Sequence, residues 1–339
     1  MAASASASAA IIFNVLLRSL RTQRIANSAY KAVAKQAQDR CRISRAVGDD
    51  DTVMLLLLDW DETLTCHDTL SLIAPPEGSQ PHGAAFSTYS SAYSADLAAY
   101  KSQHAEPCTL DEQLKWLDGL DEVELKSQER IEQGGLFRGA LESDLLQRAT
   151  RVQLRRGVDK LAQWAQSDGH ESEVHIISVG WSARFIEGSL KHHLSWVPNS
   201  IHANEVELNS QGIGTGRLTK SASVTSSSGG IRTSTHKAAE AASIDLQARK
   251  ERALKGLTVY AGDSGTDLNA LLSADLGIVM GEAKGLKEIL NRIEQPDWLI
   301  EMNAWLEERR SGRRRARDHT LVRVDDWLEA VQVLQELHQ

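Results

Sequence analysis

The sequence predicts a doubly wound α/β fold, in which a Rossmann-like parallel sheet carries helices on both faces. Short apolar runs of strand length recur along the chain, each is followed by small or polar residues, and amphipathic helical patterns lie between them. Continuous apolar runs are typical of strands buried on both faces. Their alternation with helices is typical of a parallel sheet. The predicted strands are Val53–Leu58, Val174–Val179, Leu257–Ala261 and Leu276–Met280.

The first predicted strand lies between the acidic run Asp49–Asp51 and Asp59. Residues 71–150 follow it, and they contain no further run of this kind. They begin with the loop APPEGSQPHGAAF and continue with helical patterns such as LDEQLKWLDGLDEVELKSQERIEQ. We interpret residues 71–150 as a helical cap inserted after the first strand. Residues 49–70 and 151–339 then form the core, and residues 1–48 form an N-terminal tail.

The later elements follow from local patterns. GVDKLAQWAQ predicts a helix before the second strand, and HKAAEAASIDLQARKERALKG predicts one before the third. Residues 201–218 predict a hairpin whose turn contains GIGTG, and residues 221–235 have the low complexity of a mobile loop. VDDWLEAVQVLQELHQ predicts a closing helix near the C-terminus.

Composition limits the classes of function. The chain has 339 residues, 41% of them hydrophobic and 25% charged, as is typical of a globular protein. The formal net charge of −8 argues against nucleic acid as a partner. The three cysteines (Cys41, Cys66 and Cys108) lie far apart, which argues against a disulfide framework. No window reaches the roughly 18 apolar residues of a membrane span.

The N-terminal tail has a composition of its own. It is rich in alanine, serine and basic residues, and its first acid is Asp39. This composition resembles a mitochondrial transit peptide, so mitochondrial targeting is one prediction. The alternative is a fraying tail on a cytoplasmic protein. Near the other end, the basic run Arg309–Arg317 is predicted to be a solvated loop or an address signal.

Polar side chains with a common chemistry follow the predicted strands. Asp59 and Asp61 follow the first strand, and Asp263 and Asp267 follow the third. Each also fits a turn, where aspartate is favoured. Ser178 also fits a small polar residue at a strand end, and Lys237 also fits a surface lysine near the start of a helix. Together they favour Mg²⁺ and phosphate, because buried carboxylates need compensation and Mg²⁺ prefers oxygen ligands.

This constellation resembles the haloacid dehalogenase superfamily of phosphohydrolases. Its motifs match in order: DxDxT as DWDET, a strand-end serine in ISVGW, a lysine in STHK, and GDxxxD as GDSGTD. The resemblance implies Asp59 as the nucleophile that forms an aspartyl-phosphate. It also implies Asp61 as general acid and base, and Ser178 and Lys237 as ligands of the phosphoryl group. Mg²⁺ would be held by Asp59, the Asp61 backbone carbonyl and Asp263, with Asp267 in support.

Within the superfamily, the chain is most similar to the phosphoserine phosphatase-like branch. ISVGWSARFI also resembles the domains that dephosphorylate thiamine phosphate, and the resemblance implies substrate contacts at Gly180 and Trp181. The expected substrate is a small phosphorylated metabolite. Thiamine monophosphate, phosphoserine and phosphorylated sugars or amines all stay open, as does the oligomeric state. A phosphotransferase and a non-catalytic phospho-ligand-binding protein are the alternative functions.

Overall fold

The computed structural model describes residues 53–78, 83–167, 172–226, 229–252, 256–312 and 318–338. The predicted targeting tail, residues 1–48, lies outside these ranges, as do five residues, 313–317, of the basic run. Within the ranges, no helix combines the length and the apolar character that a membrane crossing requires.

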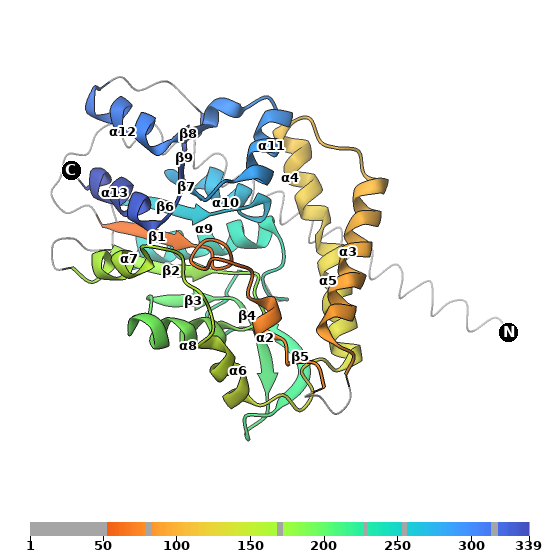
Figure 1. Ribbon diagram of the computed structural model, residues 1–339. Helices are drawn as coiled ribbons and strands as arrows, with labels where there is room; N and C mark the ends of the chain where they lie inside the picture. Colours follow the sequence, from red (N-terminus) through yellow and green to blue (C-terminus); the bar gives the residue numbers. More distant parts are fainter. Residues whose placement is uncertain are drawn as a thin grey trace. The chain divides into compact units, whose positions relative to one another are not determined.

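A seven-stranded sheet forms the centre of the fold, and all its strands are parallel (Figure 1). The strand order is β3-β2-β1-β6-β7-β9-β8. All five residues of β1 are buried, as a strand covered on both faces requires. The predicted doubly wound α/β fold is therefore confirmed. The strands are β1 (Met54–Leu58), β2 (Ser172–Ile177), β3 (Ser200–His202), β6 (Leu257–Gly262), β7 (Leu276–Met280), β8 (Leu299–Glu301) and β9 (Leu321–Val324).

The register of the central strands aligns their carboxyl ends. Leu58 at the end of β1 pairs with Ile176 of β2 on one side and with Ala261 of β6 on the other. The chain leaving each strand therefore emerges at the same edge of the sheet. Ligands of doubly wound sheets bind at this edge.

Helices pack around the sheet and in the segment inserted after β1. In the inserted segment α3 packs against α5, while α4 contacts α9 and α6 contacts α8. Elsewhere α7 packs against α13, and α9 against α10. The helices of the segment are α2 (Leu70–Ile73), α3 (Phe86–Gln103), α4 (Leu110–Gly119), α5 (Asp121–Gly134) and α6 (Glu142–Ala149). The others are α7 (Val158–Ala165), α8 (Ala183–Leu194), α9 (Ser234–Arg252), α10 (Leu268–Ser273), α11 (Lys284–Arg292), α12 (Met302–Arg310) and α13 (Trp327–Leu337), with the 3₁₀ turns η1 (Gly265–Asp267) and η2 (Pro296–Trp298).

Local signals explain several helix ends. Thr109 and Glu112 form a capping box at the start of α4, in which each side chain accepts from the other residue's backbone N–H. Asp326 accepts hydrogen bonds from two backbone N–H groups at the start of α13. Gly135 follows α5 with a φ of 72°, a left-handed conformation that favours glycine.

The predicted hairpin is present, but it begins later than expected. Strands β4 (Asn204–Leu208) and β5 (Gly214–Lys220) form it. Residues 200–202 belong instead to β3 at the edge of the large sheet. The sequence carries no turn signal between the two strands, because a single buried alanine, Ala203, separates them. The prediction of one hairpin over 201–218 was therefore wrong at its start.

The described part of the loop before α9 packs against the rest of the fold. Residues 221–226 and 229–233 form neither helix nor strand, as predicted. Val224 and Ile231 are nevertheless buried. The side chain of Asn204 accepts from the N–H of Ile231 at 2.9 Å and donates to its carbonyl at 2.8 Å. These contacts hold the described part of the loop against the hairpin.

Candidate active site

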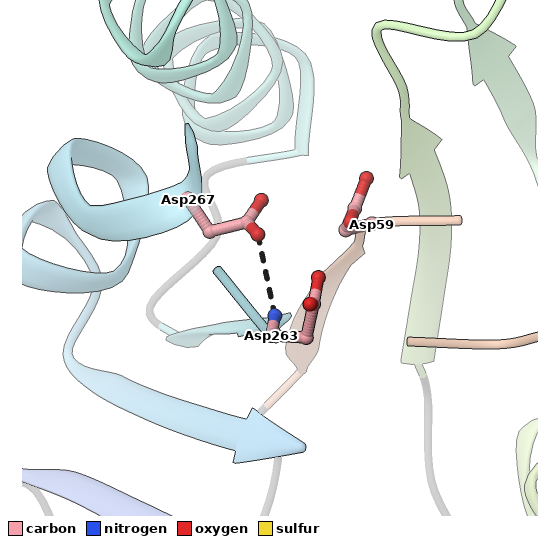
Figure 2. Close-up of side chains that lie close together, drawn as sticks. All are labelled: Asp59, Asp263 and Asp267. Carbon is pink, nitrogen blue, oxygen red and sulfur yellow. Dashed lines mark hydrogen bonds between the residues drawn. The ribbon is translucent and has the colours of Figure 1, made fainter. Parts of the chain in front are cut away.

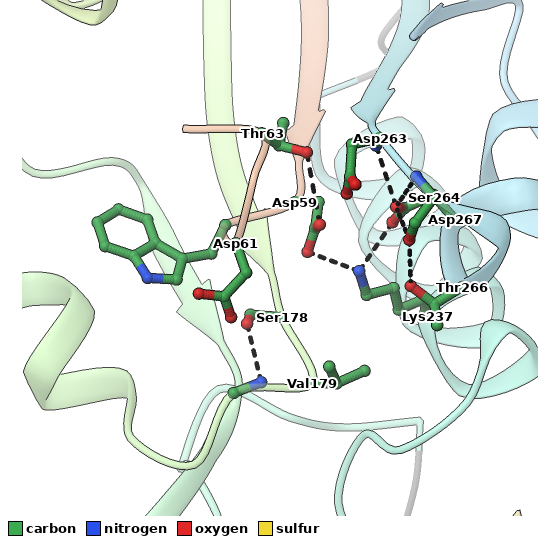
Figure 3. A network of polar contacts seen from close by, with 12 residues as sticks. Asp59, Asp61, Thr63, Ser178, Val179, Lys237, Asp263, Ser264, Thr266 and Asp267 are labelled. Carbon is green, nitrogen blue, oxygen red and sulfur yellow. Dashed lines mark hydrogen bonds and ion pairs between the residues drawn. The ribbon is translucent and has the colours of Figure 1, made fainter. Parts of the chain in front are cut away.

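Asp59 is the first residue after β1, and it is 4% exposed. Its backbone N–H donates to the carbonyl of Ala261 at 2.9 Å, so the residue is held between β1 and β6. Its Oδ1 accepts from Lys237 Nζ at 2.6 Å, and its Oδ2 lies 3.4 Å from the hydroxyl of Thr63 (Figure 3). A buried carboxylate is thus aimed at the strand-end edge by a rigid strand.

Lys237 lies in the first turn of α9 and is 1% exposed. Its Nζ donates to Asp59 Oδ1 at 2.6 Å and to Asp267 Oδ1 at 2.7 Å. Burial alone would lower the pKa of this ammonium, but the charges of Asp267 and Asp59 outweigh burial and raise the pKa. The lysine is therefore a fixed positive charge between two carboxylates.

Asp267 holds the lysine and shapes the loop after β6. Its Oδ1 also accepts from the hydroxyl of Tyr260 at 2.9 Å. Its Oδ2 accepts from the backbone N–H groups of Asp263 and Ser264, each at 3.2 Å (Figure 2 shows the first). Gly262 is required beside it, since an added Cβ would lie 2.4 Å from Asp267 Cγ. Asp267 thus fixes both Lys237 and the loop after β6.

Asp263 differs from Asp267 in that no described residue donates a hydrogen bond to its carboxylate. Burial, followed by the charge of Asp267, raises the pKa of Asp263 to about 7. Burial and the same neighbour raise the pKa of Asp59 well above its usual range, although Lys237 opposes the shift. Both carboxylates are therefore under-compensated by the protein alone.

These residues fit a divalent cation. Asp59, Asp263 and Asp267 each offer one carboxylate oxygen, and the three oxygens lie within 4.8 Å of one another (Figure 2). Three carboxylates against the single ammonium of Lys237 leave two negative charges, which a cation of charge +2 would balance. An all-oxygen donor set is the kind that Mg²⁺ prefers.

Asp61 does not join this cluster of acids. Its Oδ1 accepts from the N–H and the hydroxyl of Thr69, each at 2.7 Å. Its Oδ2 faces the loop after β2, where a Cβ added to Gly180 would lie 3.7 Å from it. Burial, and then the charge of Asp68, raises the pKa of Asp61 to about 6, although the hydrogen bonds from Thr69 lower it.

Ser178, Gly180 and Trp181 come from the loop after β2, because that strand ends at Ile177 rather than at Val179 as predicted. Ser178 is fully buried, and its Oγ accepts from the N–H of Gly180 at 2.9 Å. A Cβ on Gly180 would lie 3.0 Å from that Oγ, which is tighter than an ordinary contact, so the turn favours a glycine. Asp61 and Ser178 lie together on the side of Asp59 away from Asp267 (Figure 3).

Trp181 is half-buried and packs against the inserted segment. Its ring makes edge-to-face contacts with Phe86 and Phe137, with centroids 5.9 and 5.8 Å away. Trp181, which was predicted to contact the substrate, is thus the residue through which the loop after β2 contacts α3.

Sequence reasoning missed the residues that support the site. Asn204 Nδ2 donates to the carbonyls of Val179 and Ile231, and so ties the loop that carries Ser178 to the loop that leads to Lys237. Trp60 and Thr69 were also missed. Of these three residues, only Asn204 had a signal in the sequence that could have found it, because it lies near the start of the predicted hairpin.

Comparisons with known proteins give relatives in sequence and in structure, whereas no family model matches the chain. The chain is 30% identical over 246 residues to a CTO1 family protein of Schizosaccharomyces pombe, which covers 71% of this chain and 86% of that protein. It is 27% identical over 178 residues to the bifunctional TH2 protein, mitochondrial, of Arabidopsis thaliana. That match covers 52% of this chain and 27% of that protein.

Similar solved structures include a phospho-aspartyl intermediate analogue of phosphoserine phosphatase. It has 14% identity and a TM-score of 0.46, and the match covers 84% of this chain and 99% of that one. Cytosolic 5′-nucleotidase IIIB bound to cytidine has 12% identity, a TM-score of 0.46 and 84% coverage of both chains.

Proposed function

The chain belongs to the CTO1 family, and from that premise we propose that it is a Mg²⁺-dependent phosphomonoester hydrolase of the haloacid dehalogenase type. The observation that carries the proposal is the division of the two motif carboxylates. Asp59 lies in an acidic cluster with Lys237, whereas Asp61 is turned away and bonded to Thr69. Two carboxylates in different environments suit a nucleophile and an acid–base group.

Asp59 is the proposed nucleophile. Its carboxylate oxygen forms a bond to phosphorus while the bond from phosphorus to the ester oxygen breaks, which gives an aspartyl-phosphate. Lys237 holds Asp59 in place and offers a positive charge to the phosphoryl oxygens. When bound by Asp59, Asp263 and the Asp61 backbone carbonyl, Mg²⁺ supplies charge neutralisation for the phosphoryl group.

Asp61 is the proposed acid and base. Its proton passes to the leaving alkoxide in the first step. In the second step the ionised carboxylate takes a proton from water, whose oxygen attacks phosphorus, and phosphate leaves as Asp59 is regenerated. A pKa of about 6 suits both roles near neutral pH. Ser178 and the turn at Gly180 are the proposed binding groups for the phosphoryl oxygens.

The proposed substrate is a small phosphorylated metabolite enclosed by residues 71–150 acting as a cap. The contacts of α4 with α9, the helix that carries Lys237, and of Trp181 with Phe86 support this role for the segment. Thiamine monophosphate, phosphoserine and phosphorylated sugars or amines are the candidates. A relative named as mitochondrial supports the proposal that residues 1–48 are a transit peptide, which fusion of this segment to a reporter tests.

A hydrolysis panel with Mg²⁺ tests the proposal. We expect p-nitrophenyl phosphate and at least one metabolite of the panel to release phosphate, and Asp59→Asn to abolish release. Asp159→Asn, which changes an exposed aspartate on α7, is the matched control and should keep activity. Absence of turnover across a broad panel would overturn the proposal. Ligand-induced thermal stabilisation without turnover would then indicate a binding protein, and transfer to an added alcohol would indicate a phosphotransferase.

A further inference from the structure

Trp60 stands between the two motif carboxylates in sequence, and it is fully buried. Its indole Nε1 donates to the hydroxyl of Thr69 at 3.1 Å. Thr69 is 2% exposed, and its N–H and hydroxyl lie 2.7 Å from Asp61 Oδ1. A buried hydrogen-bonded chain therefore runs from the indole through the threonine to the carboxylate.

The chemistry of the groups sets the direction of this chain. An indole N–H can only donate, so the Thr69 oxygen must accept from Trp60. The threonine hydroxyl has one hydrogen, and the carboxylate is its acceptor at 2.7 Å. Trp60 thus fixes the rotation of the Thr69 hydroxyl toward Asp61.

Thr69 has no competing use for its hydroxyl in the described part of the chain. The residue stands at the start of α2, yet its side chain makes no capping hydrogen bond to that helix. Asp61 Oδ1 receives both donors of Thr69. Its other oxygen, Oδ2, faces the loop of Ser178 and Gly180, where the phosphoryl group is proposed to bind.

We propose that Trp60 and Thr69 are positioning residues, which hold the Asp61 carboxylate so that Oδ2 is the oxygen that exchanges the proton with the ester and the water. The inference rests on the proposed function, because it deepens the role given there to Asp61. It also explains why the motif carries a tryptophan: the ring fills a buried space, and its N–H reaches Thr69.

The test uses leaving groups that differ in their need for an acid. An alkyl phosphate needs protonation of its leaving oxygen, whereas p-nitrophenolate leaves without it. kcat/KM reports the steps up to formation of the aspartyl-phosphate. We therefore compare kcat/KM for the best alkyl phosphate with kcat/KM for p-nitrophenyl phosphate. The ratio of the first to the second measures the contribution of the general acid. A positioned acid contributes about 10²–10⁴-fold, so we expect Thr69→Val and Trp60→Phe each to lower this ratio about tenfold.

Two further variants separate positioning from general damage. Thr69→Ser keeps the hydroxyl and should restore the ratio. In the double variant Trp60→Phe/Thr69→Val the ratio should be no lower than in Thr69→Val, because the tryptophan acts through the hydroxyl. An unchanged ratio in Thr69→Val, or an equal further loss on adding Trp60→Phe, would overturn the proposal.

Matched controls come from elsewhere in the fold. Trp327 is equally buried and donates its Nε1 to the carbonyl of Thr63 at 2.9 Å. The buried Thr258 donates its hydroxyl to Asp245 at 2.6 Å. Trp327→Phe and Thr258→Val remove the same kinds of hydrogen bond without touching Asp61, so they should lower thermal stability and leave the ratio as in the wild type. Controls that lower the ratio as much would also overturn the proposal.

A spectroscopic measurement keeps this inference distinct from the proposed function. The indole ¹⁵N–¹H resonance of Trp60, assigned by its absence in Trp60→Phe, should shift in Thr69→Val and in Asp61→Ala. If the resonance does not move in either variant, the chain is refuted whatever the enzyme hydrolyses. If it moves while the wild type hydrolyses no phosphate ester, the proposed function fails and the hydrogen-bonded chain stands.

Discussion

Replacing Lys237 with methionine tests the electrostatic design of the site. The change removes the ammonium from between Asp59 Oδ1, 2.6 Å away, and Asp267 Oδ1, 2.7 Å away, and keeps an unbranched apolar side chain. All three side chains are buried, so water cannot replace the lost charge. Removing one partner of a buried ion pair costs about 3–5 kcal/mol of unfolding free energy.

The carboxylates can limit this loss by taking up a proton. Protonating an aspartate of ordinary pKa costs ~1.4 kcal/mol for each pH unit above ~3.9, hence about 4 kcal/mol at pH 7 and about 1.5 kcal/mol at pH 5. We therefore expect Lys237→Met to lower the unfolding free energy of the metal-free protein by about 3–4 kcal/mol at pH 7, and by about half of that or less at pH 5.

Urea unfolding in EDTA at the two pH values measures the difference, with the slope of the transition checked for constancy. Lys284→Met is the control, because Lys284 and its partner Glu282 are 80% and 73% exposed, and it should cause no resolvable change. A loss below about 1 kcal/mol at pH 7 would refute the reasoning, since it lies under the range for a broken buried pair. An equal loss at both pH values would refute it as well.

Three further predictions concern stability and support of the site. The pKa of Asp263 is raised to about 7, so the stability that its protonated form contributes is lost as pH rises through that value. Thermal scans in EDTA should therefore show a lower Tm at pH 8 than at pH 5, and Mg²⁺ should raise the Tm more at pH 8. A Tm that rises with pH would contradict this. Asn204→Ala removes the hydrogen bonds from the side chain to the backbone groups of Val179 and Ile231. We expect urea unfolding to show an unfolding free energy lower by about 2–4 kcal/mol, and kcat/KM to fall as well. Unchanged values of both quantities would contradict the tie between the loops. Glu62 has a φ of 55°, so Glu62→Gly should relieve left-handed strain and raise the unfolding free energy by up to about 1 kcal/mol. A clear decrease in the unfolding free energy would instead argue that the Glu62 side chain stabilises the turn.

The central sheet was predictable because buried parallel strands leave a simple signature. The run MLLLL and its counterparts LTVYAG in β6 and LGIVM in β7 are mostly apolar, and each is followed by a small or acidic residue. The edge strands lack that signature. β8 has three residues, and β9 reads LVRV, with Arg323 partly buried and paired to Asp325. Their strand character comes from pairing with neighbours, which a single sequence does not display.

The approach of Asp59 and Asp267 to each other was predictable for a related reason. Strands in register deliver their following residues to one edge, so acids after β1 and β6 must approach each other. The chain from Trp60 through Thr69 to Asp61 was not predictable. It depends on the path of the loop after β1, which includes the left-handed Glu62, and no periodic pattern encodes such a path.

The proposed chemistry predicts where the phosphoryl group is found during turnover. Mass spectrometry of acid-quenched reactions with Mg²⁺ and the best substrate of the panel should find a phosphoryl group on the peptide that contains Asp59. The signal should accumulate in Asp61→Asn if dephosphorylation slows, and it should vanish in Asp59→Asn. Full turnover by Asp59→Asn, or a phosphoryl group on any other residue, would contradict the account.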